Sequence, residues 1–185
     1  LGDIGSHAHN LVRYVTGLEV QRLFADLGTV VEGRELDDDA TVLLELDGGV
    51  RGLLFASQIA TGERNHLRLR VYGSEGALDW SQEDPNRLRL ISPDGSERVL
   101  FRGAGDLSAA AVEHTRLPGG HPEGFIEAFA NVYRNAAIAI ESGVTDGDFP
   151  SVQDGAHGVH FIHSAVASHK EGQWVAAAYS PPATS

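Results

Sequence analysis

The sequence predicts an α+β fold, with an open-faced, largely antiparallel β-sheet and helices on one face. Alternation of apolar and polar residues, typical of half-buried strands, dominates the chain between residues 20 and 101. Apolar residues that recur every three or four positions, typical of helices with one buried face, lie at both ends of the chain. Because short turns connect most strands, the sheet should be antiparallel, with one face free for a partner.

The first helix is predicted from Asp3 to Thr16, with Gly17 as its stop. Strands should follow in order, joined by turns rich in glycine, asparagine, aspartate and proline. They are expected at 20–31, 41–46, 50–59, 66–72, 77–81, 87–91 and 97–101, with a short last strand at 174–176. The predicted sheet therefore forms from consecutive hairpins.

Beyond residue 101 the pattern changes to a long loop and two helices. Residues 103–120 are rich in glycine and alanine and should form a loop. Pro122 stands where a helix accepts its first residue, and that helix should end at Gly143. Ser151 with Asp154 resembles a capping box, which opens a last helix toward Gly172.

Length and composition limit the possible functions. A chain of 185 residues with 42% apolar content supports one domain, expected over residues 1–179, with a flexible tail at 180–185. Its 14 basic against 26 acidic residues argue against nucleic acid and membrane surfaces as partners. The absence of cysteine excludes disulfides and thiolate zinc sites. With neither signal peptide nor spanning segment, we expect a soluble, cytoplasmic protein.

The first helix carries the strongest candidate for chemistry. Asp3, His7, Asn10 and Tyr14 are spaced by four, three and four residues, so they form one polar stripe. A carboxylate one turn from an imidazole can hydrogen-bond it and raise its pKa, as acid–base catalysis requires. The alternative is that Asp3 only caps the helix, with His7 and Asn10 as solvated neighbours.

Other histidines give weaker signals. His121 precedes the second helix in a Gly-Gly-His-Pro sequence, so it is either a ligand contact near a helix N-terminus or a surface residue. His157, His160 and His163 are three residues apart and fan over about 120°, which disfavours a shared metal. The chain holds no dinucleotide, phosphate-loop or metalloprotease motif, and Gly73–Gly76 is a turn between strands.

Four blocks in order resemble the C-terminal domain of the Gfo/Idh/MocA oxidoreductases, which include glucose-fructose oxidoreductase and inositol dehydrogenase. The blocks are GDIGSHAHNLVRYVTGLEV, LRVYGSEGALDW, GHPEGFIEAFANVY and DGAHGVHFIHSAVASHKEGQWV. The resemblance implies an N-terminal Rossmann domain that binds NAD or NADP, followed by an open-faced sheet domain that binds substrate and forms homo-oligomers. Because the chain starts at Leu1 without methionine and lacks the nucleotide fingerprint and the E-K-P lysine, we expect a fragment that is inactive alone.

The resemblance also implies roles for single residues. In the family, a D-x-x-x-H pair at the start of this helix moves a proton from a sugar or polyol hydroxyl while hydride passes to nicotinamide. These roles map onto His7 and Asp3 as catalytic residues. The family often has an aspartate at Asn10, and asparagine can bind a hydroxyl but cannot act as a base. Asn10 is therefore expected to bind substrate, and the resemblance implies the same role for His121. We expect no cofactor-binding residue and no metal ligand in this chain.

Three functions remain open at this point. The first is the substrate-binding and oligomerisation domain of an NAD(P)-dependent dehydrogenase that acts on a sugar, polyol or related compound. The second is a non-catalytic module that associates through its sheet face. The third is a metal-dependent hydrolase or isomerase built from Asp3, His7 and a further histidine.

Overall fold

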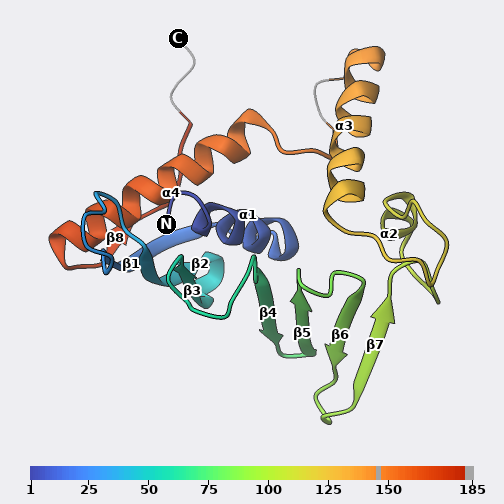
Figure 1. Ribbon diagram of the computed structural model, residues 1–185, viewed down its shortest axis with the longest axis horizontal. Coiled ribbons are helices and arrows are strands. Elements are labelled where there is room, and N and C mark those ends of the chain that lie inside the picture. The colour runs from blue at the N-terminus through green and yellow to red at the C-terminus, as the bar shows by residue number, and fades with distance from the viewer. Residues whose placement is uncertain (145–146, 182–185) are drawn as a thin grey trace. The chain divides into compact units, whose positions relative to one another are not determined.

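The computed structural model describes residues 1–144 and 147–181 of the chain (Figure 1). The contacts within the chain divide it into two units. The first unit comprises Leu1–Glu63 and Ser151–Ser185, and the second comprises Arg64–Pro150.

The first unit is a four-stranded sheet with two helices. Its strands are antiparallel in the order β3-β2-β1-β8, and a 3-10 turn, η1 (Asp47–Gly49), joins β2 to β3. The elements are α1 (Gly5–Thr16), β1 (Val20–Gly28), β2 (Asp39–Leu46), β3 (Arg51–Ser57), α4 (Val152–Glu171) and β8 (Val175–Ala176). Figure 1 shows α1 and α4 on the same side of these strands.

The core of the first unit lies between this sheet and its helices. In β2 every second residue is buried, and Val42 and Leu44 pack in one cluster with Leu23 of β1. Helix α4 contributes Phe161 and Ala165 to the same cluster. Burial of these side chains supplies most of the free energy that holds helix to sheet, at about 1.5–3 kcal/mol for each large side chain.

The opposite face of this sheet is exposed. Leu43 of β2 pairs with Leu53 of β3, and Thr41 pairs with Phe55. Leu43, Leu53 and Phe55 all keep large exposed areas because strand side chains alternate between faces. The free sheet face that the sequence predicts is therefore present, and it is partly apolar.

The second unit contains an antiparallel meander in the order β4-β5-β6-β7, followed by two helices. These elements are β4 (Arg68–Gly73), β5 (Gly76–Ser81), β6 (Arg87–Ile91), β7 (Glu97–Phe101), α2 (Ala109–Glu113) and α3 (Phe125–Ser142). Gly76 has a φ of 149°, and a Cβ there would lie 2.6 Å from the carbonyl oxygen of Ile91. Glycine is thus required where the predicted Gly73–Gly76 turn leads into β5.

Polar groups organise the second unit. Asp79 is buried on β5, and its carboxylate accepts hydrogen bonds from Arg68 at 3.0 and 2.7 Å and from Arg89 at 3.0 Å. The hydrogen bonds from Arg68 are the largest cause that lowers the pKa of Asp79, with the charges of Arg70 and Arg89 adding to it. A carboxylate among guanidinium groups stays ionised, so these strands are cross-linked by charge.

The predicted fold class is confirmed, whereas the grouping of the strands differs from the prediction. The sequence predicts one sheet, but the described strands form two sheets of four. Residues 58–67, between β3 and β4, form turns and bends instead of a ladder, with Gly62 at a φ of 97°. Because alternation along a strand does not identify its neighbour, the sequence could not show this break.

Several element boundaries also differ. The predicted strand 20–31 ends at Gly28 because the carboxylate of Asp38 accepts the backbone N–H groups of Val30 and Val31 at 2.8 and 3.0 Å. The predicted loop 103–120 contains α2, which Ser108 caps by accepting from the backbone N–H of Ala111 at 3.2 Å. Residues 182–185 of the predicted tail lie outside the described residues.

Candidate functional site

Three members of the predicted polar stripe, His7, Asn10 and Tyr14, lie on α1, whereas Asp3 precedes the N-cap, so the helix begins at Gly5 and not at the predicted Asp3. Asp3, His7, Asn10 and Tyr14 are all exposed. Ile4, Ala8 and Val12 are partly buried and pack against the core of the first unit. The stripe therefore faces outward while its apolar neighbours anchor the helix.

Asp3 is not the helix cap that the alternative interpretation requires. The N-cap position of α1 is Ile4, and no side chain caps this end. Instead, the Oδ2 atom of Asp3 accepts a hydrogen bond from Nε2 of Gln58, 2.9 Å away, just beyond β3. The carboxylate is thus held by a residue from another element.

His7 lies in the first turn of α1, four residues after Asp3, and is exposed. Among the interactions of the described residues, the Asp3 side chain accepts from Gln58, and the expected hydrogen bond between Asp3 and His7 is absent. The imidazole and the carboxylate are both exposed. Asn10 lies three residues after His7 on α1 and is also exposed, so two groups able to contact hydroxyls lie along one side of the helix.

His9, which the sequence analysis did not single out, is buried. Its exposed fraction is 4%, and its ring stacks on Phe161 of α4, with 4.3 Å between centroids and 12° between planes. Burial, assisted by the nearby charge of Arg13, lowers the pKa of His9 to about 4. The burial of His9 could have been inferred from the sequence, because His9 follows Ala8 by one residue and precedes Val12 by three, beside the apolar stripe.

We expect acid to destabilise the first unit through His9. The pKa of His9 is about 4 in the folded protein and about 6.5 when unfolded, so the unfolded state binds an extra proton between these values. The stability from neutral His9 is fully present above pH 6.5 and is lost as pH falls toward 4. The loss is roughly 3 kcal/mol at the low end. Urea unfolding at pH 7 and at pH 4.5 measures it.

His9→Leu should flatten this part of the pH profile because leucine does not titrate. His163→Gln, which changes an exposed histidine of α4, is the matched control and should keep the wild-type profile. Equal pH slopes for wild type and His9→Leu between pH 4 and 6.5 would contradict the assignment.

An ionic cluster joins α1 to α4. Arg13 donates to both oxygens of Glu19 at 2.8 Å each and to Asp154 at 3.1 Å. His157 lies 3.2 Å from Glu19 through Nδ1. The hydrogen bond from Arg13 is the largest cause of the lowered pKa of Glu19. Arg13 and His157 therefore help to hold α1 against α4.

The three histidines of α4 have different surroundings. His157 and His160 lie against the ring of Tyr179, at centroid distances of 4.6 and 5.7 Å, whereas His163 is exposed. Over residues 1–144 and 147–181, no group of three or more His, Asp or Glu side chains is arranged to hold a metal ion.

His121 belongs to the second unit and is exposed. The predicted helix start at Pro122 is wrong: α3 begins at Phe125, and Glu127 accepts from the backbone N–H of Gly124 at 2.8 Å. His121 therefore lies in the loop before the helix, outside its first turn. Its backbone carbonyl accepts a hydrogen bond from Arg102.

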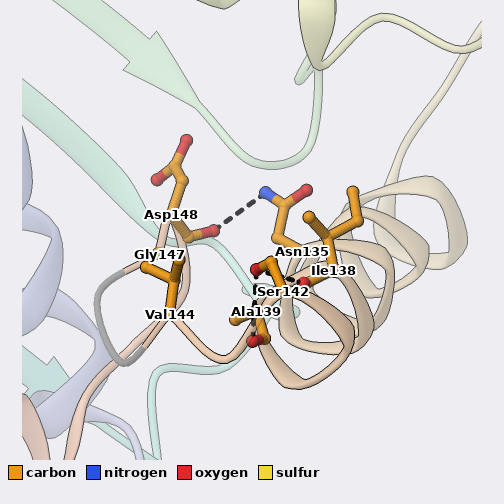
Figure 2. A pocket seen from close by; sticks show the side chains of 7 residues that line it. All are labelled: Asn135, Ile138, Ala139, Ser142, Val144, Gly147 and Asp148. Carbon is orange, nitrogen blue, oxygen red and sulfur yellow. Dashed lines mark hydrogen bonds between the residues drawn. The ribbon is translucent and has the colours of Figure 1, made fainter.

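A cavity of about 210 Å³ lies in the second unit, beside the C-terminal half of α3 (Figure 2). It is lined by Asn135, Ile138, Ala139, Ser142, Val144, Gly147 and Asp148. Asn135 Nδ2 donates to the backbone oxygen of Asp148 at 3.0 Å across its rim. None of the four predicted site residues lines this cavity.

Comparison with known proteins places these features in a family context. Residues 1–79 match the family model described as GFO/IDH/MocA C-terminal domain. The chain is 29% identical over 185 residues to an uncharacterized oxidoreductase of Bacillus subtilis (strain 168), with 95% of this chain and 47% of that protein covered. These matches confirm the resemblance seen in the sequence.

Solved structures give the same result. An oxidoreductase from Sinorhizobium meliloti matches with a TM-score of 0.90 and 43% identity, over 94% of this chain and 51% of that chain. An inositol dehydrogenase homolog from Azotobacter vinelandii, complexed with NADH and myo-inositol, matches with a TM-score of 0.89 and 32% identity, over 94% and 48%. The chain thus spans about half the length of each relative.

Across residues 1–144 and 147–181, no helix is long and apolar enough to span a membrane.

Proposed function

We propose that this chain, which belongs to the Gfo/Idh/MocA oxidoreductases as a C-terminal domain, is the substrate-binding and oligomerisation half of an NAD(P)-dependent dehydrogenase. The enzyme would oxidise a hydroxyl of a sugar, polyol or related compound by hydride transfer. Residues 1–179 would form this domain. The proposal rests chiefly on similarity over 94% of the chain to the inositol dehydrogenase homolog that is complexed with NADH and myo-inositol.

The exposed stripe on α1 supports this chemistry. His7 would accept the proton of the substrate hydroxyl, and Asp3, one turn away, would stabilise the resulting imidazolium charge. Asn10 would donate and accept hydrogen bonds with a neighbouring hydroxyl but could not take a proton. His121 remains a substrate contact predicted from the sequence alone.

The contact between Gln58 and Asp3 bears on this proposal. An amide N–H donated to Oδ2 leaves the other carboxylate oxygen and the negative charge available. Asp3 can therefore be oriented by Gln58 and still attract a positive imidazolium ring at His7. The apo arrangement does not need a direct bond between them, since catalytic hydrogen bonds tighten when substrate is present.

The nicotinamide nucleotide would supply the hydride acceptor and would be held mainly by a second, N-terminal half such as the relatives' additional length provides. The residues of this chain suit the substrate side. The one glycine-rich candidate, Gly73–Gly76, closes the β4–β5 turn, and Gly76 lies against the carbonyl of Ile91.

We propose further that a second copy of the protein covers the exposed face of the first unit's sheet. Leu43, Leu53 and Phe55 form adjacent positions on that face. An apolar patch framed by charged residues is typical of interfaces between subunits. The expected absence of nucleic acid and membrane partners, and the cytoplasmic location, remain predictions from the sequence.

The proposed function is tested with the full-length protein that carries this chain. It is incubated with NAD⁺ or NADP⁺ and a panel of sugars and polyols that includes myo-inositol, and reduced nicotinamide is followed by its absorbance. We expect turnover with at least one polyhydroxylated substrate and none from residues 1–185 alone. A full-length protein that self-associates but reduces neither nucleotide would support the non-catalytic module instead.

A further inference from the structure

Helix α3 exposes an apolar stripe along one side. The stripe consists of residues that recur every three or four positions, namely Phe125, Phe129, Val132, Tyr133, Ala136 and Ile140. Tyr133 is 72% exposed, Ile140 is 80% exposed, and the other large side chains of the stripe are exposed as well. The charged residues of the helix lie on the opposite side, and they are Glu127, Arg134 and Glu141. A contiguous apolar surface of this kind is typical of a protein-binding site.

The polar side of α3 attaches the helix to the second unit. Asn131, which is buried, accepts from Nε of Arg116 at 2.8 Å and donates from Nδ2 to the carbonyl of His114 at 2.8 Å. One turn further, Nδ2 of Asn135 donates to the backbone oxygen of Asp148 at 3.0 Å. The helix is therefore fixed by its polar side, and its apolar stripe stays exposed.

The order of side chains along α3 is matched about a point between Val132 and Tyr133. At equal distances on either side of that point, every exposed apolar residue has an apolar counterpart, and the bulky Phe129 has the small Ala136. The corresponding pairs are Val132 with Tyr133, Phe129 with Ala136, Ala128 with Ala137, and Phe125 with Ile140. When two helices cross antiparallel about a two-fold axis through that point, the members of each pair lie opposite each other. The stripe is thus complementary to a second copy of itself.

We propose that α3 pairs antiparallel with α3 of a second copy of the protein, about a two-fold axis between Val132 and Tyr133. Phe129 then lies opposite the partner's Ala136, and a large side chain that faces a small one fills the interface without overlap. An unrelated partner would require no symmetry within the helix, so the matched order favours a second copy.

The exposed area of α3 suits such a contact. A stable interface buries about 800 Å² on each partner, and a single aromatic side chain covers about 150–250 Å². The three aromatic side chains of the stripe, together with its aliphatic residues, offer an area on the order of that of a stable interface. Phe125 and Ile140 form the outermost pair, at the rim of the contact, where single side chains contribute little to affinity.

The first test exchanges the sizes of one pair in the full-length protein. Phe129→Ala leaves a gap, and Ala136→Phe places two bulky rings opposite each other. Each should raise the dissociation constant between the copies at least about tenfold in sedimentation equilibrium. The double variant again pairs one large with one small side chain, so it should regain most of the wild-type affinity. A double variant as weak as the product of the two single effects overturns the inference.

A charge at the centre of the stripe should separate the copies. Tyr133→Glu should halve the mass of the assembly at the same protein concentration, because the carboxylate would be buried without a partner. Val112→Glu is the matched control, since Val112 is an exposed apolar residue of α2 in the same unit. It should leave the mass unchanged. A mass that Tyr133→Glu does not change, in a variant with the circular dichroism of wild type, overturns the inference.

Photo-cross-linking identifies what covers the stripe. The photoreactive residue p-benzoylphenylalanine replaces Tyr133 in the full-length protein, and unlabelled and isotope-labelled copies are mixed and left to exchange. Mass spectrometry should find α3 joined to α3 of a differently labelled copy. Capture of the first unit, capture of a segment outside these 185 residues, or no capture overturns the inference. The same replacement at Glu141, on the opposite side of the helix, is the control and should capture no other copy.

None of these measurements requires turnover. The pairing of α3 therefore stands or falls independently of the dehydrogenase activity proposed above. It also concerns a different surface from the sheet face of the first unit, so a loss of association in a Leu53→Glu variant would not account for the effects at α3.

Discussion

Replacement of His7 with alanine should lower kcat of the full-length protein by about 10²–10⁴-fold, because a positioned general base contributes that much to a proton transfer. His7 is exposed on α1, so its removal leaves no cavity, and the fold should persist. Steady-state turnover with the best polyol measures the effect. Circular dichroism and the unfolding midpoint verify that the variant remains folded.

The matched control is His163→Ala, an exposed histidine on α4 of the same unit. It has the same substitution chemistry without a place on the polar stripe, and it should turn over at the wild-type rate. Equal activity of His7→Ala and His163→Ala would remove the acid–base role from His7. The domain would then be assigned to binding alone.

Replacement of Phe161 with alanine should reduce the free energy of unfolding by about 3–5 kcal/mol. The side chain is 2% exposed, belongs to the core of the first unit and stacks on His9 at 4.3 Å. Its removal leaves a cavity between α4 and the sheet, and it also strips the buried imidazole of its ring contact. Urea unfolding, read by far-UV circular dichroism, measures the change.

Phe125→Ala provides the comparison at a position that is 74% exposed. Because the ring of Phe125 buries little area, the change should stay within about 0.5 kcal/mol. A small effect at Phe161, or equal effects at the two positions, would contradict the assignment of the core to the first unit.

The local elements could be predicted because their signals are local. The helix ending at Gly17, the capping box of Ser151 with Asp154, and the turn that leads into β5 all depend on residues within one or two turns of each other. The start of α3 could not be predicted in this way. Pro122 is a permitted first residue, but Glu123 beside it is taken up by Arg102, and the helix begins only at Phe125.

The candidate site was predicted in part. The spacing of Asp3, His7 and Asn10 predicts one shared face, and all three side chains are exposed, although Asp3 precedes the N-cap of α1. The partner of Asp3 could not be predicted, since Gln58 is 55 residues away and reaches it only after β3 has packed near α1. The hydrogen bonds that join Arg102 to Glu123 and Asn86 could not be predicted either, because these residues are also far apart in the sequence.

The sequence by itself determined the α+β class, the order of the strands and of the three longer helices, and the exposure of His7, Asn10 and Tyr14 on α1, because periodicity and turn chemistry act over a few neighbouring residues. Only the tertiary structure decided that the strands form two sheets and that His9 is buried while His7 is exposed. It also decided that the carboxylate of Glu123 accepts a hydrogen bond from the backbone N–H of Leu117, in the loop that carries His121. Those outcomes depend on strand partners, on burial against α4 and on charge pairs between distant residues, which come together only when the chain has folded.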